Sequence, residues 1–261
     1  MYAMERHQLI ERMVSQDGRV AVVDLAERFG VTTETVRRDL DQLERAGALR
    51  RVHGGAVARE RMSLAEPSLA ERASVRGAAK QEIAERALDV LGDGFRGSIY
   101  LDAGTTTAAL AALLPTRLAE TDGTAEVVTH AMTIAAVLAG SPRLSLTVIG
   151  GRVRGLTGAA VGSHTVRAVE GLRPDVAFIG TNGISAGFGL STPDPEEAAV
   201  KRAIVQSARR VVVVSDAQKF DAELLVAFAG LDDIDVVVAD RTPGAALGAA
   251  LEEAGTEVWT A

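Results

Sequence analysis

Residues 21–57 read AVVDLAERFGVTTETVRRDLDQLERAGALRRVHGGAV, and this stretch decides the fold of the N-terminal part of the chain. Val23–Phe29 has one apolar face and ends at Gly30, a residue type favoured just after a helix. Thr32 is a typical helix cap, and the helix predicted after it spans about 14 residues. The apolar residues of that helix recur at helical spacing, at Val36, Leu40 and Leu43.

The sequence on either side completes a recognisable unit. Residues 4–16 carry apolar side chains on one side and predict an amphipathic helix. After residue 47, Ala48–Val52 and Ala56–Ala58 predict two short strands around a glycine-rich turn. Helix, short helix, glycine turn, capped helix and hairpin is the order of a winged helix-turn-helix. We therefore predict a DNA-binding domain over residues 1–58.

In such a domain the third helix enters the major groove, with its first residues nearest the bases. Arginine can bind guanine through two hydrogen bonds or hold a phosphate as a fork, and threonine suits a phosphate or a thymine methyl group. The hairpin would contact the DNA backbone. The residues that we expect to contact DNA are Thr33, Glu34, Thr35, Arg37, Arg38, Arg50, Arg51 and His53. The alternative for Arg37 and Arg38 is a solvated helix face paired with Glu34 or Asp41, but the surrounding unit favours DNA.

Composition limits the remaining possibilities. The net charge is −7, yet residues 1–60 hold ten arginines and ten acidic residues, so the negative charge belongs to the rest of the chain. Residues 37–61 hold seven arginines and four acidic residues, as expected for a DNA contact. Cysteine is absent, which excludes disulfides and thiolate metal sites. No apolar block is long enough to span a bilayer, and residues 1–10 lack a signal-peptide core, so we expect a cytoplasmic protein. We expect neither a metal nor a cofactor.

Beyond residue 58 the pattern changes. Residues 59–76 are polar and contain Pro67, as a linker would, and residues 78–91 predict a helix. Apolar strand-like runs then alternate with alanine-rich helical segments. The expected strands are Ser98–Leu101, Val127–Thr129, Leu144–Ile149, Val176–Ile179, Val211–Val214 and Val236–Ala239. The expected helices are Thr107–Leu114, Met132–Leu138, Ser163–Gly171 and Pro195–Ala208. This alternation predicts a doubly wound α/β domain over residues 77–261, with a buried parallel sheet covered by helices on both faces.

The loop Asp102-Ala103-Gly104-Thr105-Thr106-Thr107 follows a predicted strand and opens a helix. Glycine permits close backbone approach, threonine hydroxyls donate hydrogen bonds, and a helix N-terminus carries positive partial charge, so the loop suits a phosphate. The alternative is a simple helix cap. The loop is not a P-loop, because the G-x-x-x-x-G-K-[ST] spacing and its lysine are absent, which argues against ATP hydrolysis.

Other polar loops follow predicted strands and are expected at the same sheet edge. Arg152 and Lys219 could neutralise a phosphate, and Asp102 and Asp216 could accept hydrogen bonds from sugar hydroxyls. His130 is either a ligand contact or a satisfied polar residue at a strand end. Glu197 and Lys201 are four residues apart on one helix, and a surface ion pair is their simplest interpretation.

Both halves resemble the DeoR family of repressors. The N-terminal resemblance covers residues 5–57, with TVRRDL and the R-x-H-G-G hairpin as its specific parts. The C-terminal resemblance rests on LDAGTTT, VIGGRVR, DVAFIGTNGI, GFGLSTPDPEEAAVKRA and VSDAQKF. The family implies a sensor domain similar in fold to ribose-5-phosphate isomerase, which binds phosphorylated sugars or related metabolites. By match, the candidate effector residues are Asp102, Gly104, Thr105, Thr106, Thr107, Gly151, Arg152, Asn182, Gly183, Glu197, Lys201, Asp216 and Lys219. His130 is a further candidate from its place at a strand end and not by match. The chain departs from the family at His130, where asparagine is usual, and at Ala217-Gln218, where two serines are usual.

The sequence thus predicts a repressor of a carbohydrate-utilisation operon whose operator affinity is modulated by a phosphorylated sugar or polyol. A single head makes too few contacts for tight specific binding, so we expect a homo-oligomer, a dimer or tetramer, on double-stranded operator DNA. One alternative is a sugar-phosphate isomerase, which would have no evident need for residues 1–58. Another is a DNA-binding head on a purely oligomerising domain, which leaves the polar strand-end loops unexplained. The sugar, the operator and the sign of the effector's action stay open.

Overall fold

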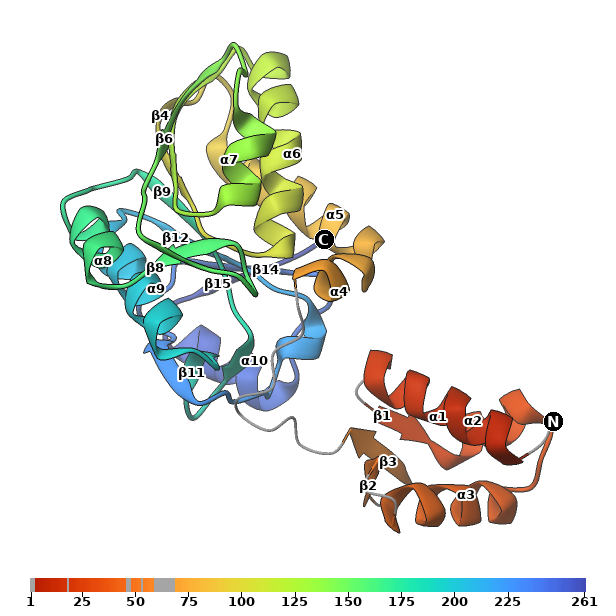
Figure 1. Ribbon diagram of the computed structural model, residues 1–261. Coiled ribbons are helices and arrows are strands. Elements are labelled where there is room, and N and C mark those ends of the chain that lie inside the picture. The colour runs from red at the N-terminus through yellow and green to blue at the C-terminus, as the bar shows by residue number, and fades with distance from the viewer. Residues whose placement is uncertain (1–2, 18, 46–47, 53, 59–68) are drawn as a thin grey trace. The chain divides into compact units, whose positions relative to one another are not determined.

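The computed structural model describes residues 3–17, 19–45, 48–52, 54–58 and 69–261 (Figure 1). The chain divides into two compact units, residues 1–62 and residues 63–261, which we call the head and the sensor. Apolar clusters confined to residues 10–56 and to residues 83–259 form their cores. Each unit is therefore described by itself.

The described part of the head contains three helices and a three-stranded antiparallel sheet in the order β1-β3-β2. Its elements are α1 (Ala3–Asp17), β1 (Arg19–Ala21), α2 (Val22–Phe29), α3 (Thr33–Arg45), β2 (Leu49–Val52) and β3 (Gly55–Ala58). The predicted helices and hairpin are confirmed. Strand β1 was not predicted, because three residues carry too little pattern and their extended form depends on pairing with β3.

The head's core joins apolar residues of all three helices to the sheet. The fully or nearly fully buried members are Ile10, Val14, Val20, Val22, Leu25, Val36, Leu40, Leu43, Leu49 and Ala56. Gly30 ends α2 in the left-handed region at φ 63°, as its place in the sequence predicts. Glycine at position 55 is required for a steric reason, because a Cβ there would lie 2.0 Å from the carbonyl oxygen of Val20. The hairpin can pack closely on β1 only with glycine at that position.

The sensor is built on a seven-stranded sheet in which every neighbouring pair is parallel. The strand order is β15-β14-β12-β9-β4-β5-β6. The strands are β4 (Arg96–Leu101), β5 (Thr124–Thr129), β6 (Leu144–Val148), β9 (Val176–Gly180), β12 (Val211–Val214), β14 (Val236–Ala239) and β15 (Glu257–Thr260). The six predicted strands are thereby confirmed, and β15 is an addition.

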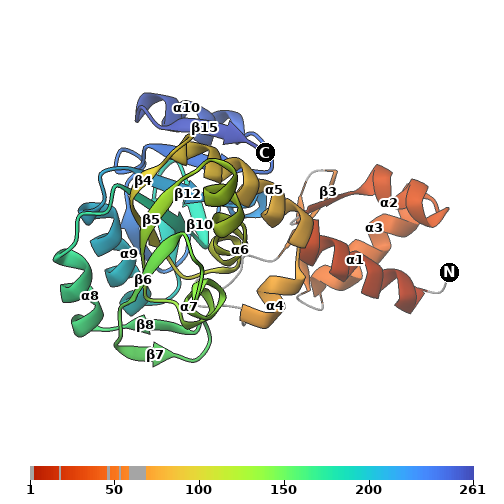
Figure 2. The same cartoon turned by 90° about the horizontal axis from the view of Figure 1, so that it is seen from above.

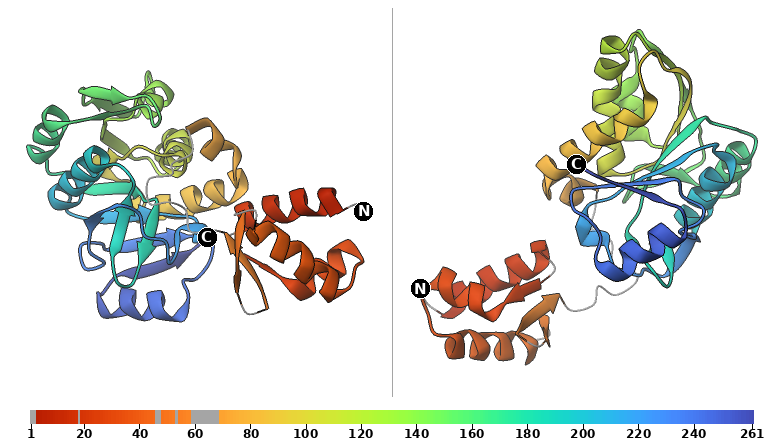
Figure 3. Two further views of the ribbon diagram at one scale, coloured as in Figure 1. Left: turned by 60° about the horizontal axis from the view of Figure 1, so that its bottom comes forward. Right: turned by 180° about the vertical axis from the view of Figure 1, so that it is seen from behind.

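Helices cover both faces of this sheet (Figures 1 and 3). One core joins Ile99 and Leu101 to α5, α6 and α7, and the other joins Tyr100 and Ala177 to α8, α9 and α10. The helices are α5 (Gly77–Ala87), α6 (Thr105–Glu120), α7 (Met132–Leu138), α8 (Ser163–Glu170), α9 (Pro195–Ser207) and α10 (Ala245–Glu253). Successive strand residues thus enter opposite cores, as the pleat requires. The predicted doubly wound α/β architecture is confirmed.

Several short elements escaped the sequence pattern. Helix α4 (Leu69–Ser74) lies within the range that we predicted as linker. Strands β7 (Arg152–Arg154) and β8 (Ala159–Val161) form a hairpin beside α7 (Figure 2), where Met132 N donates to Gly158 O at 2.9 Å. Strands β10 (Gly183–Ser185), β11 (Gly189–Thr192) and β13 (Val226–Ala229) form a second small sheet. Elements this short depend on tertiary contacts and leave little periodicity in the sequence.

Across the described ranges, no helix combines the length and the apolar composition that a membrane span requires. Nor do these ranges contain a group of three or more His, Asp and Glu side chains arranged to hold a metal ion.

Candidate functional sites of the head and the sensor

The exposed face of α3 carries both arginines of the TVRRDL motif. The Arg37 and Arg38 side chains are 54% and 81% exposed. Each lies near a carboxylate oxygen of Glu34, at 3.7 and 3.9 Å respectively. Ion pairs this exposed contribute little free energy. Both guanidinium groups are therefore free to leave Glu34 for a phosphate or a base edge.

Threonines cap the start of α3. Thr32 Oγ1 accepts the backbone N–H of Thr35 at 3.2 Å and lies 2.9 Å from the Thr35 hydroxyl. The cap satisfies one of the first backbone donors of the helix. Thr33 is exposed beside it, whereas Thr35 is half-buried. Of the two predicted threonine contacts, Thr33 is the more accessible.

The opposite face of α3 is bound to α1 by a buried carboxylate. Asp39 accepts from Arg6 Nε at 2.8 Å and from Arg6 Nη2 at 3.2 Å, and His7 Nε2 lies 3.0 Å from its Oδ1. The Arg6 and Asp39 side chains are 10% and 7% exposed. Asp39 was not assigned a role from the sequence. Its place in the structure explains an acidic residue directly after two arginines, since it holds α3 against α1 while the arginines face outward.

The predicted contacts of the hairpin have mixed positions. Arg51, on β2, donates through Nη1 to Arg37 O at 3.2 Å and also binds Asp41, and its own N–H donates to Glu44 at 2.7 Å. The Arg51 guanidinium is thus engaged by α3, so a phosphate contact would require it to leave these partners. Arg50 lies on β2. His53 lies outside the described residues.

In the sensor, three of the predicted residues, Asp102, His130 and Lys201, lie together where the strand order changes direction. The chain runs from β4 outward to β5 and β6, then returns to β9 on the other side of β4. Ligands of open α/β sheets bind beyond the strand ends at such a point. Asp102 follows β4 there and is fully buried, and its Oδ2 accepts from the N–H of Gly180, at the end of β9, at 3.0 Å.

Lys201 of α9 completes this junction. Its buried ammonium donates to Asp102 Oδ2 and to Gly180 O, the latter at 2.8 Å, and lies 5.5 Å from the centre of the Phe228 ring. The simplest interpretation of Glu197 and Lys201, a surface ion pair, is wrong. Both side chains are buried, and each binds a different partner.

Glu197 instead anchors the β7–β8 hairpin to the start of α9. Its Oε1 accepts from the Thr157 hydroxyl and from Arg154 Nη1, the latter at 3.2 Å, while Arg154 Nε lies 3.0 Å from Asp194 Oδ2. Arg152 forms an exposed ion pair with Glu196 of the same helix. The sequence predicted Arg152 as the cation of this hairpin and missed Arg154, which is the less exposed of the two.

His130 extends the junction along the sheet edge. It is 3% exposed, its Nδ1 lies 3.0 Å from the Tyr100 hydroxyl, and its Nε2 lies 3.7 Å from Asp102 Oδ1. Burial lowers the pKa of His130 below its ordinary value and outweighs the carboxylates of Asp102 and Glu197, which favour the protonated ring; Lys201 lowers it further. Burial also raises the pKa of Tyr100 well above its ordinary value. At neutral pH both groups are therefore uncharged.

The glycine-threonine loop forms the N-terminus of α6. Gly104 adopts φ 148°, and no side chain caps the helix there. Thr107 is fully buried and its hydroxyl donates to Gly104 O at 3.0 Å, whereas Thr106 is mostly buried and Thr105 is half-buried. The first backbone donors of this 16-residue helix thus have no side-chain acceptor among the residues that the structure describes. This is the arrangement that binds anions at helix N-termini.

Three predicted positions have clear packing roles. A Cβ at Gly151 would lie 2.1 Å from Thr165 Oγ1, and one at Gly183 would lie 2.3 Å from Ala222 O. Asn182 Oδ1 accepts from the Thr192 hydroxyl at 3.1 Å. These contacts shape the loops around the junction and explain the residue types without a ligand.

Lys80 is a buried lysine near the last strand-end loop, and the sequence did not single it out. Asp216 accepts from Gln218 N at 3.1 Å and caps the short helix that contains Lys219. Lys80 of α5 is buried, and this burial lowers its pKa; the charge of Asp216 acts in the opposite direction, and that of Lys219 lowers the pKa further. Its ammonium donates to the carbonyls of Arg72 and Val75 at the end of α4.

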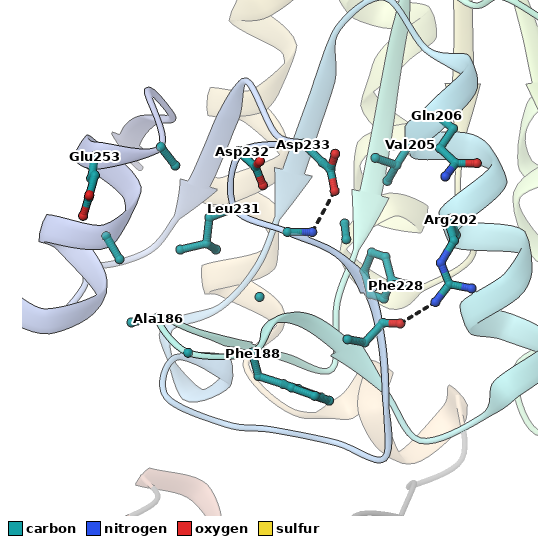
Figure 4. Close-up of a pocket in the computed structure, with 17 residues that line it drawn as sticks. Ala186, Phe188, Arg202, Val205, Gln206, Phe228, Leu231, Asp232, Asp233 and Glu253 are labelled. Atoms are coloured by element: carbon teal, nitrogen blue, oxygen red, sulfur yellow. Dashed lines mark hydrogen bonds between the residues drawn. The ribbon is translucent and has the colours of Figure 1, made fainter.

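Two cavities border these elements. One of about 180 Å³ lies between α4, α5 and the first turns of α6 and α7, and includes Lys80, Thr105 and Thr133. A larger groove of about 660 Å³ separates the turn that carries Phe188 from Arg202 of α9 (Figure 4). None of the predicted effector residues lines this groove. Of the predicted effector residues, Thr105 lines the smaller cavity.

Known proteins match both units. A family model described as the DeoR-like helix-turn-helix domain matches residues 6–62, and one described as the DeoR C-terminal sensor domain matches residues 76–241. An uncharacterized HTH-type transcriptional regulator, FruR of Bacillus subtilis, is 35% identical over 240 residues, which is 92% of each chain. GlpR of Haloferax volcanii is 33% identical over 256 residues, or 98% of this chain and 96% of that protein. The glycerol-3-phosphate regulon repressor of Escherichia coli K12 is 28% identical over 243 residues, or 93% of each.

Among solved structures, ribose 5-phosphate isomerase A of Methanocaldococcus jannaschii aligns with a TM-score of 0.39 and 19% identity, over 54% of this chain and 53% of that one. An alignment at this level adds nothing to the architecture described above. The family models and the relatives, by contrast, cover both units and nearly the whole length of the chain. The chain belongs to the DeoR family of helix-turn-helix transcriptional regulators.

Proposed function

We propose that the chain represses a carbohydrate-utilisation operon and that a phosphorylated sugar or polyol changes its affinity for the operator. The observation that supports this most directly is the uncapped N-terminus of α6, beside the buried Asp102–Lys201 pair at the switch point of the sheet. Backbone donors favour a dianion, and a carboxylate favours hydroxyl donors. A molecule with both a phosphate and hydroxyl groups matches the two.

Operator recognition is assigned to the exposed start of α3. Thr33, Glu34, Arg37 and Arg38 contact the major groove in this proposal, and the hairpin contacts the backbone. One head provides few phosphate contacts, so the functional form is a homo-oligomer, a dimer or tetramer, that binds repeated half-sites in the cytoplasm.

The alternative, catalysis by the sensor, finds less support. Acid–base catalysis needs a carboxylate or amine within reach of the substrate and with a proton to exchange. Asp102 and Lys201 bind each other, and Glu197 is bound by Arg154 and Thr157. These pairs fit a binding site, and we propose that the chain is not an enzyme.

The experiment compares matched ligands. Glycerol 3-phosphate, fructose 1-phosphate and fructose 6-phosphate are tested against glycerol and fructose, by calorimetry and by operator binding in fluorescence anisotropy. Each phosphate that binds is expected to do so at least tenfold more tightly than its parent, since a charge-assisted hydrogen bond is worth about 1.5–3 kcal/mol. Equal binding within every pair would contradict the phosphate site, and product formation in the same samples would favour the isomerase.

A further inference from the structure

The buried junction contains one acceptor without a donor. Asp102 Oδ2 binds Lys201 and Gly180, but Asp102 Oδ1 is buried and has no hydrogen-bond partner among the described residues. A buried carboxylate oxygen left unpaired costs free energy that a donor would recover. The ring nitrogen His130 Nε2 lies 3.7 Å from this oxygen, beyond hydrogen-bond distance.

Tyr100 determines which nitrogen of His130 carries the proton. The Tyr100 phenol is fully buried and protonated, and its hydroxyl is hydrogen-bonded to His130 Nδ1. Buried donors rarely stay unpaired, so the phenol donates and Nδ1 accepts. The neutral ring then carries its proton on Nε2. The opposite tautomer would leave the Tyr100 proton unpaired and would direct a lone pair of Nε2 toward the Asp102 carboxylate.

A donor and an acceptor therefore stand side by side at the sheet edge. Nε2–H can only donate, and Asp102 Oδ1 can only accept. Two atoms 3.7 Å apart can both lie about 2.8 Å from a single oxygen atom. A hydroxyl group satisfies both at once, because it donates one proton and accepts another. A carbonyl oxygen cannot donate to Asp102, and a deoxygenated carbon serves neither.

We propose that His130 is a specificity-determining residue of the effector site, which together with Asp102 Oδ1 binds one hydroxyl group of the effector, and that Tyr100 positions it. This inference rests on the proposed effector function and adds the chemical group that the site recognises, a hydroxyl. Because Asp102 is fully buried, admitting the hydroxyl requires the surrounding loops to part. The ligand thus binds one arrangement of the loops better than the other, as any effector must.

The test combines variants with pairs of ligands that differ in one hydroxyl. The probes are glucose 6-phosphate with its 2-deoxy analogue, ribose 5-phosphate with its 2-deoxy analogue, and glycerol 3-phosphate with dihydroxyacetone phosphate. In the wild-type chain, the hydroxyl member of at least one pair is expected to bind about tenfold more tightly. The variant His130→Phe should lose this difference while binding the weaker member as before. His164→Phe, on the exposed side of α8, is the control and should leave it intact.

Two further measurements keep the proposal falsifiable. If His130→Phe does not fold, Tyr100→Phe/His130→Phe removes both partners of the buried hydrogen bond and is less disruptive. Nitrogen-15 NMR of the wild-type chain at neutral pH should show His130 protonated at Nε2 alone, and Tyr100→Phe should change that population. Protonation at Nδ1, equal affinity within every pair that binds, or a tenfold preference that survives in His130→Phe would overturn the proposal. Failure of every phosphate to bind would contradict the proposed function itself, and this outcome differs from any that contradicts the role of His130 alone.

Discussion

Removal of the Asp39 carboxylate should unfold the head while leaving the sensor folded. In Asp39→Ala the guanidinium of Arg6, only 10% exposed, loses two hydrogen bonds of 2.8 and 3.2 Å and the carboxylate that pairs with it. Breaking one partner of such a pair costs about 3–5 kcal/mol. A domain of this size is stable by about 3–9 kcal/mol, at 0.05–0.15 kcal/mol per residue. The substitution therefore removes a large part of the head's stability.

Hydrogen exchange of the full-length chain measures this unit by unit. Peptides from α1 and α3 should exchange at least 100-fold faster in Asp39→Ala, and peptides from β4 and β9 should not change. Operator affinity should fall with the folded fraction of the head. Replacement of both partners, in Arg6→Met/Asp39→Leu, should restore most of the protection, because an apolar pair of similar volume is often neutral or stabilising. Wild-type protection in Asp39→Ala would refute the reasoning, and a double variant as labile as the single one would refute the buried-charge explanation.

Three further predictions concern operator binding by the head and the stability of the sensor. Arg37→Ala and Arg38→Ala together should abolish specific operator binding at unchanged thermal stability, because each bidentate pair between an arginine and a base is worth about 1–3 kcal/mol, and a gel shift with wild-type affinity would remove the assignment. Gly151→Ala should destabilise the sensor by about 1–3 kcal/mol because its Cβ would meet Thr165 Oγ1 at 2.1 Å, whereas Gly150→Ala, with open space around it, should be neutral in the same thermal melts. The lowered pKa of His130 means that the unfolded chain binds a proton near pH 6.5 that the folded chain refuses, so stability should fall as the pH drops below that value. Urea unfolding at pH 7.5 and 5.5 should show a smaller loss in His130→Asn than in the wild-type chain, and an equal loss would contradict the assignment.

The sequence predicted the head well because its elements are defined locally. Helical spacing of Val36, Leu40 and Leu43, a threonine cap and a glycine stop each depend on a few neighbouring residues. In the sensor, apolar strands with polar residues at their ends were enough to bring Asp102 and His130 to one sheet edge. Parallel strands put their carboxyl ends together, so this part follows from topology.

The pairing of charges at that edge did not follow from sequence spacing. Glu197 and Lys201 stand four residues apart, yet each pairs with a residue that another part of the sheet supplies. Tyr100 was missed, although it lies two residues before Asp102 and so on the same face of β4.

The small number of lysines was informative but was not used in the prediction. The chain has 25 arginines and three lysines, and two of the three, Lys80 and Lys201, are buried with their ammonium groups on backbone carbonyls. A compact ammonium fits such sites where a planar guanidinium does not.

The order of the strands bears on how the sensor can form during synthesis. Strand β4 is made first and lies inside the finished sheet, β5 and β6 add beyond one of its edges, and β9, β12, β14 and β15 then add one after another beyond the other. No strand has to insert between two that are already paired. A chain emerging from the ribosome, where N-terminal parts fold first, can therefore extend the sheet by growth at its free edges alone. The outermost strand on the late side, β15, also follows the other six strands in the sequence, so the sheet is completed only after all of them have been translated.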